Sequence, residues 1–96
     1  MSYRLIIRKR AGLHLYDTYE WYEQKRASLG SEFLLSVEAA LNAIQQNPYL
    51  FSVRFKNVRC ALTPRFPYGI FYIIDGDKII VISVFHLSRN PKLWKS

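Results

Sequence analysis

Hydrophobic positions in the first half of the chain recur at helical spacing in two successive stretches. The apolar positions of the first stretch are Ala11, Leu15, Tyr19 and Tyr22. Those of the second stretch are Phe33, Val37, Leu41 and Ile44. We expect Gly30 to end the first helix, Ser31 to cap the second, and Asn47-Pro48 to end it. The pattern therefore predicts two amphipathic helices joined by a very short turn.

Strand patterns lie on both sides of these helices. The expected strands cover residues 3–8, 52–55, 58–63, 69–74 and 78–85. The turn at 75–77, Asp-Gly-Asp, is typical of a hairpin. The last two runs are apolar on both faces, which places them centrally in a sheet. The sequence predicts an α+β fold in one domain, residues 1–96, with the order β-α-α-β-β-β-β and a helical hairpin on an antiparallel sheet.

The charge of the chain is unevenly distributed. The net charge is +7, but residues 1–51 carry six basic and five acidic side chains, close to balance. Residues 52–96 carry eight basic side chains and only two acids. This distribution indicates a polyanion or an acidic protein as partner, the alternative being a soluble basic protein with scattered charge. The run Arg8-Lys9-Arg10 is interpreted as a solvated cluster ahead of the helix.

Cys60 is the single cysteine, so an internal disulfide and a cysteine-rich metal site are not expected. It falls in an expected strand and is interpreted as a small core residue. We expect neither a metal nor a cofactor. The N-terminal residues run directly into a strand without a signal peptide, and no apolar run reaches the length of about 18 residues that a membrane span needs. These features predict a cytoplasmic protein.

The common catalytic signatures are missing from the sequence. Neither a phosphate-binding glycine loop nor a nucleophile elbow is present. The carboxylates are expected on the outer faces of the helices, where they cannot form a catalytic pair. Arginine, lysine, histidine and tyrosine side chains remain as the candidates for chemistry.

Several short motifs together resemble the ParE/RelE superfamily of bacterial toxins, which includes plasmid stabilisation proteins. They are Phe66-Pro-Tyr-Gly-Ile-Phe-Tyr, the Asp-Gly-Asp turn, His86-x-x-Arg89-Asn-Pro-x-x-Trp94, Trp21-Tyr22-Glu23, Gly30-Ser-Glu-Phe33 and Asn47-Pro48. The resemblance covers nearly the whole chain in the right order. It implies a toxin encoded beside an antitoxin, whose extended or helical segment wraps the toxin and neutralises it.

The superfamily divides by target. The resemblance implies one of two activities. RelE-like members are metal-independent, ribosome-dependent mRNA endonucleases, whereas ParE-like members poison DNA gyrase. The RelE-like pattern has an arginine early in the strand at 69–74 and another at the end of the following strand. This chain has Gly69 at the first place and Phe85-His86-Leu87 at the second. The resemblance is therefore closer to ParE, as is the tail with Arg89 and Trp94.

The leading hypothesis is a ParE-like type II toxin that inhibits growth by binding a protein target such as gyrase. A RelE-like endonuclease acting on ribosome-bound mRNA is the first alternative, and an inactive antitoxin-binding member is the second, so enzymatic activity stays open. The nuclease hypothesis would use His86 as general base, with phosphate held by Arg59, Arg65 and Arg89.

The candidate residues for binding the target or the antitoxin are Arg59, Arg65, Arg89, Lys92 and Trp94. Structural roles compete with these assignments: His86 can bond the tail to the sheet, Arg89 can anchor the tail, and Trp94 can pack it on the sheet.

Overall fold

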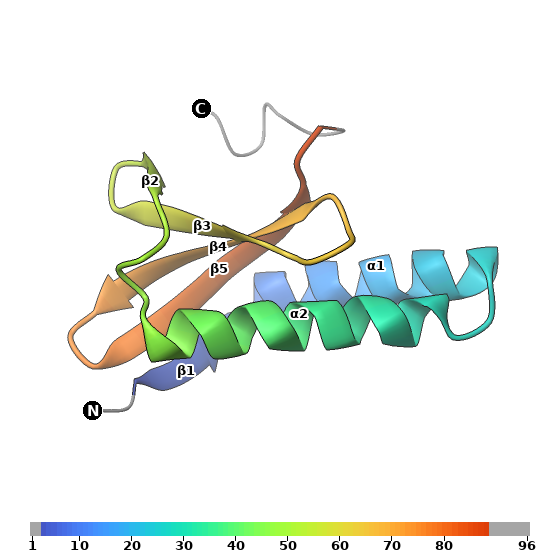
Figure 1. The fold of residues 1–96 in the computed structure, drawn as a ribbon, viewed down its shortest axis with the longest axis horizontal. Coiled ribbons are helices and arrows are strands. Elements are labelled where there is room, and N and C mark those ends of the chain that lie inside the picture. The colour runs from blue at the N-terminus through green and yellow to red at the C-terminus, as the bar shows by residue number, and fades with distance from the viewer. Residues whose placement is uncertain (1–2, 89–96) are drawn as a thin grey trace.

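The computed structural model of the chain describes residues 3–88, which form two helices and a five-stranded sheet (Figure 1). The elements are β1 (Arg4–Ile7), α1 (Lys9–Lys25), α2 (Leu29–Gln46), β2 (Val53–Phe55), β3 (Val58–Leu62), β4 (Tyr68–Asp75) and β5 (Lys78–His86). Their order confirms the α+β prediction, and each strand lies within two residues of its expected bounds. The tail residues Arg89, Lys92 and Trp94 lie outside the described residues.

The strands are ordered β1-β5-β4-β3-β2, so β4 and β5 have neighbours on both sides, as their apolar patterns predict. The pairs among β2, β3, β4 and β5 are antiparallel. Strand β1 differs, because it pairs parallel to β5 with Ile6 opposite Ile80. The sheet is therefore mixed rather than purely antiparallel. Helices, not a hairpin turn, connect β1 to the other strands, so turn geometry does not impose its direction.

Both helices lie on one face of the sheet (Figure 1). The core between the layers contains Phe33, Val37 and Ile44 from α2, with Ala11 from α1. The sheet contributes buried side chains from three strands: Ala61, Tyr68, Ile70, Tyr72, Ile79, Val81 and Val84. The helical members of this core belong to the two stripes that the sequence periodicity predicts. Removal of the core side chains from water is the main stabilising term of a domain this small.

The junction of the two helices differs from the expectation. Helix α1 ends at Lys25 and α2 begins at Leu29, so Gly30 lies inside the second helix instead of ending the first. The carboxylate of Glu23 accepts hydrogen bonds from the backbone N–H groups of Ser28 and Gly30, each at 2.9 Å. This carboxylate performs the capping role expected of Ser31.

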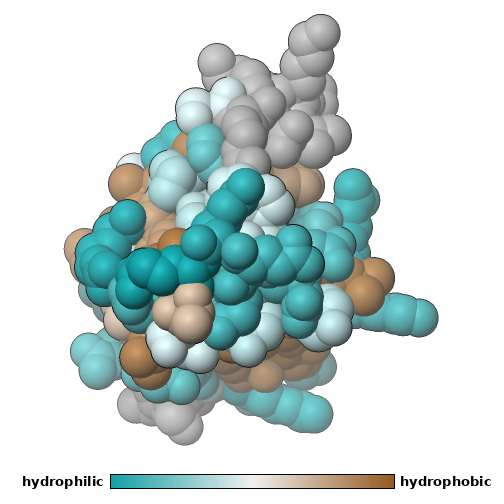
Figure 2. Space-filling model, turned by 90° about the vertical axis from the view of Figure 1, so that its right-hand side faces the viewer, coloured by the Kyte–Doolittle hydropathy of each residue, from teal (hydrophilic) through white to brown (hydrophobic). Residues whose placement is uncertain are grey.

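Gly30 is instead required by the close approach of the helices. A Cβ atom there would lie 2.6 Å from the backbone oxygen of Tyr19, which is shorter than any van der Waals contact. Figure 2 views the end of the molecule at which the helices are joined, where hydrophilic residues dominate the centre of the surface. The tight junction is thus held by a polar network at a solvated end of the domain.

Candidate functional site

Arg59 lies in β3 and contacts the segment that follows α2. Its Nη1 atom donates a hydrogen bond to the backbone oxygen of Phe51 at 2.6 Å, and the oxygen of Tyr49 lies 3.4 Å away. Its guanidinium group also lies over the ring of Tyr49, 5.2 Å from the centroid. Arg59 therefore fastens this segment to the sheet, in addition to any role in binding a partner.

Arg65 lies in the connection between β3 and β4, in the left-handed backbone region at a φ of 70°. Its Nη2 atom lies 2.9 Å from Oε1 of Glu32, while Nη2 of Arg26 lies 3.3 Å from Oε2 of the same carboxylate. The hydrogen bond from Arg65 is the main cause that lowers the pKa of Glu32. Both guanidinium groups are well exposed, so they remain accessible to a partner and their pairing adds little stability.

His86 ends β5 and lies opposite Tyr68 in β4. The two rings meet edge to face with centroids 5.2 Å apart. The Nδ1 atom of His86 accepts a hydrogen bond from the backbone N–H of Ser88 at 3.2 Å. This geometry matches the structural role considered for His86, in which the imidazole bonds the following residues to the end of the sheet.

The structure brings some of the sequence-predicted residues together and separates others. Arg65 and His86 lie at the same end of the sheet, where the backbone N–H of Leu87 donates to the oxygen of Pro67 at 2.9 Å. Arg59 pairs with Tyr72 in β4, whereas His86 pairs with Tyr68, four residues earlier in the same strand. By strand geometry this separation is roughly 13 Å along the sheet. The described residues therefore do not unite Arg59 with His86 in one phosphate-binding cluster.

The RelE-like pattern has arginine at the place of Gly69 and at that of Phe85-His86-Leu87, and Gly69 and Phe85 lie on the helix-free face of the sheet. A Cβ atom at Gly69 would lie 2.7 Å from Sγ of Cys60 and 2.8 Å from Cδ2 of Leu87. Phe85, which pairs with Gly69, has its ring 4.9 Å from that of His14 and 6.0 Å from that of Phe71. Gly69 is thus enclosed by apolar side chains, and Phe85 packs against neighbouring rings.

Cys60 is buried, as the sequence predicts, and burial raises the pKa of its thiol to about 11. A thiol with so high a pKa carries almost no thiolate near neutral pH, and thiolate is the reactive form. Cys60 is therefore a packing residue on the helix-free face, where its sulfur covers the backbone of Gly69.

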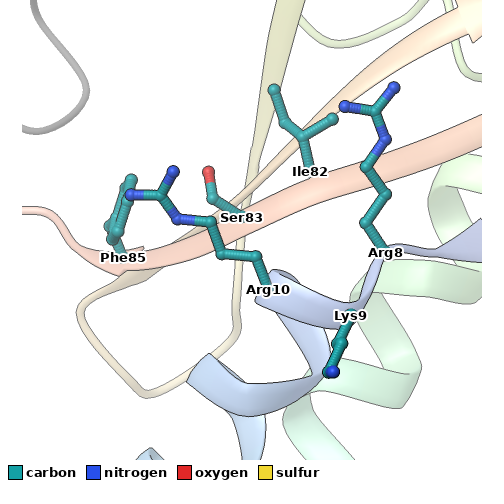
Figure 3. A pocket seen from close by; sticks show the side chains of 6 residues that line it. All are labelled: Arg8, Lys9, Arg10, Ile82, Ser83 and Phe85. Atoms are coloured by element: carbon teal, nitrogen blue, oxygen red, sulfur yellow. The ribbon is translucent and has the colours of Figure 1, made fainter.

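A basic pocket lies where β1 passes into α1. It has a volume of about 580 Å³ and is lined by Arg8, Lys9, Arg10, Ile82, Ser83 and Phe85 (Figure 3). From the sequence, the three cations are expected to form a solvated cluster and no site. One sequence signal does mark them: basic residues at a helix start oppose the helix dipole, which favours acidic side chains there.

An exposed apolar segment follows α2 and continues into β2. Its large exposed apolar side chains are Tyr49, Leu50, Val53 and Phe55. The most exposed of them is Leu50, at 70%. A group of exposed apolar side chains on a small domain is a feature of protein-interaction sites. Cationic side chains accompany them in the sequence at Arg54 and Lys56.

Two further features of the described residues concern metal ions and membranes. Within residues 3–88, no group of His, Cys, Asp and Glu side chains is arranged to hold a metal ion. Neither of the two described helices is long and apolar enough to cross a membrane.

A helical hairpin on one face of a five-stranded sheet, in a small basic domain, is the architecture implied by the resemblance to RelE- and ParE-type toxins. Comparison with protein families defines the group more narrowly. Residues 5–91 match the family described as the ParE toxin of the type II toxin–antitoxin system parDE. The chain belongs to this family, and a type II system of this kind pairs its toxin with an antitoxin.

A solved structure described as the chromosomal ParDE toxin–antitoxin system from P. aeruginosa has a similar fold. The TM-score is 0.77 at 16% sequence identity, and the similarity covers 88% of this chain and 95% of that chain. A search of curated protein sequences gives no match. The structural similarity supports the fold, and the family match supports the class of toxin.

Proposed function

We propose that this protein is the growth-inhibiting toxin of a parDE pair, that it acts by binding DNA gyrase, and that a cognate antitoxin neutralises it. One observation carries the choice of target class. Gly69 has no space for a side chain beside Cys60 and Leu87. The arginine that RelE-like nucleases use at this position therefore has no counterpart here, and the neighbouring residues could not accommodate one without moving.

The exposed apolar segment from Tyr49 to Phe55 supports a protein target. Burial of apolar side chains drives most protein–protein association, whereas a nuclease surface that holds RNA needs mainly cations and stacking rings. Arg59 orients this segment through its bond to the oxygen of Phe51. The surface is thus held in place before a partner binds, which lowers the entropic cost of association.

The mRNA endonuclease is retained as the second candidate because Arg65 and His86 lie at the same end of the sheet. In such a mechanism the imidazole could act as general base and the cation could stabilise the charge that develops on the phosphate. If this candidate is correct, His86→Ala abolishes toxicity while binding of the antitoxin survives. Toxicity retained by a folded His86→Ala protein removes the imidazole from the mechanism.

The experiment that separates the candidates follows macromolecular synthesis in a bacterial host after tight induction of the chain. Incorporation of labelled thymidine and labelled amino acids is measured in parallel in the first minutes. The gyrase proposal predicts early loss of DNA synthesis with message intact. Early loss of protein synthesis with DNA synthesis continuing supports the endonuclease, and no effect of soluble, folded protein supports an inactive antitoxin-binding member.

The antitoxin surface can be tested with a matched pair of arginines. Arg65 and Arg26 contact the same carboxylate of Glu32 and are similarly exposed, but only Arg65 is proposed to bind the antitoxin. We expect Arg65→Gln to weaken antitoxin binding by roughly tenfold, the loss of one charge-assisted hydrogen bond, and Arg26→Gln to leave it unchanged. Equal effects of the two variants would remove Arg65 from the interface.

A further inference from the structure

The pocket between β5 and the start of α1 results from the unequal lengths of two strands. Strand β1 has four residues and pairs with β5 only as far as Val81. The backbone N–H of Arg8 then donates to the oxygen of Val81 at 3.0 Å, and the chain turns into α1 at Lys9. Strand β5 continues to His86. The second half of β5 is therefore bordered by the basic start of α1 instead of by another strand.

An irregularity in β5 shapes the floor of this pocket. The register of β5 against β4 shifts between the pairs Tyr72–Val81 and Phe71–Ser83, so Ile82 is an extra residue. Such bulges redirect side chains and occur frequently beside functional sites. Here the bulge presents Ile82 and Ser83 next to each other in the pocket, with Phe85 further along the strand.

Two of the three cations of the pocket extend over this floor. Figure 3 shows Arg8 and Arg10 extending over β5 on either side of Ser83, whose hydroxyl group points in the same direction, while the side chain of Lys9 extends away from them. No carboxylate lines the pocket, and neither ion pair within residues 3–88 involves these cations. The positive field also reaches His14, whose pKa is lowered first by burial and then by the charge of Arg10.

The cluster is unfavourable for the helix on which it lies. The first turn of α1 contains no acidic residue, and its N-cap residue, Arg8, makes no side-chain capping bond. Positive charge at a helix N-terminus opposes the dipole, and three consecutive cations also repel one another. A bound anion would relieve both effects. The described part of the chain supplies no such anion.

We propose that this pocket binds the phosphodiester backbone of DNA, with the guanidinium groups of Arg8 and Arg10 on the non-bridging oxygens and the hydroxyl of Ser83 as a further donor. Arginine forks suit phosphate oxygens, and two forks on opposite sides can engage two oxygens of one phosphate or two successive phosphates.

The edge of β5 argues against an acidic peptide as the occupant. An extended peptide would gain affinity by adding a strand to this edge. The backbone N–H of Val84 already donates to Nδ1 of His14 at 3.2 Å, so α1 occupies the edge at that point. A ligand must therefore be held by the cationic side chains and the hydroxyl group of the pocket. Proteins bind the backbone of nucleic acids through side-chain contacts of this kind.

The inference goes beyond the proposed function and is tested without gyrase. Binding of the full chain to a short fluorescent DNA duplex is measured by anisotropy over a range of salt concentrations. We expect Arg8→Gln combined with Arg10→Gln to weaken binding at low salt by roughly tenfold or more. The slope of log affinity against log salt should decrease in magnitude by about 2, because two phosphate contacts are lost.

The matched control removes two cations at the opposite end of the same strand pair, Arg4→Gln with Lys78→Gln, which face each other in the β1–β5 register. It has the same net charge as the pocket variant and should retain the affinity and the salt slope. Equal weakening by both variants would show that only the overall charge attracts DNA, and would overturn the proposal.

Two further arms complete the test. Arg8→Lys with Arg10→Lys keeps the charge without the forks and should bind DNA with intermediate affinity; affinity equal to the unmodified protein would contradict recognition by guanidinium groups.

A fluorescent polyglutamate peptide replaces DNA in the second arm. If the pocket variant loses the peptide but not the duplex, the pocket is a site for an acidic protein segment and the proposal is wrong. Thermal melts of each variant confirm that the protein is folded.

Discussion

The backbone of Gly69 in β4 lies so close to Cys60 in β3 that a Cβ atom at Gly69 would stand 2.7 Å from the cysteine sulfur. Cδ2 of Leu87 approaches the same point to 2.8 Å. This contact separates the chain from the RelE-like pattern more clearly than the sequence difference alone. A side chain is excluded at the position, so the glycine there reflects how the helix-free face is packed.

Gly69→Arg should therefore destabilise the protein instead of creating nuclease activity. We expect a loss of at least about 2 kcal/mol in the free energy of unfolding, because the new side chain must displace Cys60 and Leu87. Urea denaturation measures the change. The control is Gly12→Ala in α1, where no atom lies within 4 Å of the added Cβ. It should stabilise the helix by about 0.5–1 kcal/mol. An unaltered stability of Gly69→Arg would contradict the packing argument.

Tyr72→Phe should cost about 1–3 kcal/mol of stability, the range for leaving a buried hydrogen-bonding group unsatisfied. Tyr72 is fully buried, and its hydroxyl group donates to the backbone oxygen of Pro48 at 2.6 Å. Burial also raises the pKa of this hydroxyl to about 12. Chemical denaturation of the variant gives the loss.

Tyr16→Phe provides the comparison for Tyr72→Phe, since the Tyr16 side chain on α1 is 61% exposed and should lose almost nothing. Similar values for the two tyrosines would show that the bond to Pro48 does not hold the segment after α2.

Glu23→Ala should weaken the junction of the helices by about 0.5–2 kcal/mol, the usual effect of removing a helix cap. The carboxylate of Glu23 satisfies the backbone N–H groups of Ser28 and Gly30 at the start of α2. Hydrogen exchange of these two amides should accelerate. Glu23→Gln, which keeps one carbonyl oxygen as acceptor, should give a smaller effect, and exchange rates that do not change in either variant would refute the capping role.

The stability of the protein should fall as the pH drops below the ordinary histidine pKa of 6.5, in part because of His14. Burial and the nearby charge of Arg10 lower the pKa of His14 in the folded state, against a smaller opposing effect of Asp17. The unfolded chain then binds a proton more readily, so the stabilising contribution is present above pH 6.5 and is lost as the pH falls through the lowered value.

Protonation of His14 also removes the acceptor at Nδ1 for the N–H of Val84. Unfolding measured from neutral pH to about pH 5 should show a shallower pH dependence for His14→Gln, which does not titrate. Arg10→Gln should move the transition of the unmodified histidine to higher pH. An identical pH profile for His14→Gln and the original chain would exclude His14 as the titrating group.

The sequence was sufficient for the order and type of the elements because each has its own local signal. The stripes of α1 and α2 have helical periodicity, and the turn at Gly76 lies between two apolar runs. The parallel pairing of β1 with β5 has no such signal, because Arg4 and its partner Lys78 are far apart in the chain. The position of Gly30 inside α2 was not predictable for the same reason. Its close approach to the backbone oxygen of Tyr19 exists only once the two helices pack.

The candidate site was only partly predictable for the same reason. Residue type identifies Arg59 as a cation, but only the structure shows that Phe51 and Tyr49 engage its guanidinium group. The basic pocket depends on β1 being shorter than β5, which places Arg10 beside Ser83. The roles of Arg89, Lys92 and Trp94 stay predictions, as they lie outside the described residues.

The most direct test of the account is the supercoiling of relaxed plasmid DNA by purified gyrase in the presence of the purified toxin. We predict that the toxin inhibits supercoiling in proportion to its concentration, and that an excess of the cognate antitoxin restores it. Supercoiling that is unchanged at toxin concentrations well above that of gyrase, with a toxin preparation that arrests growth when induced, would contradict the proposed target.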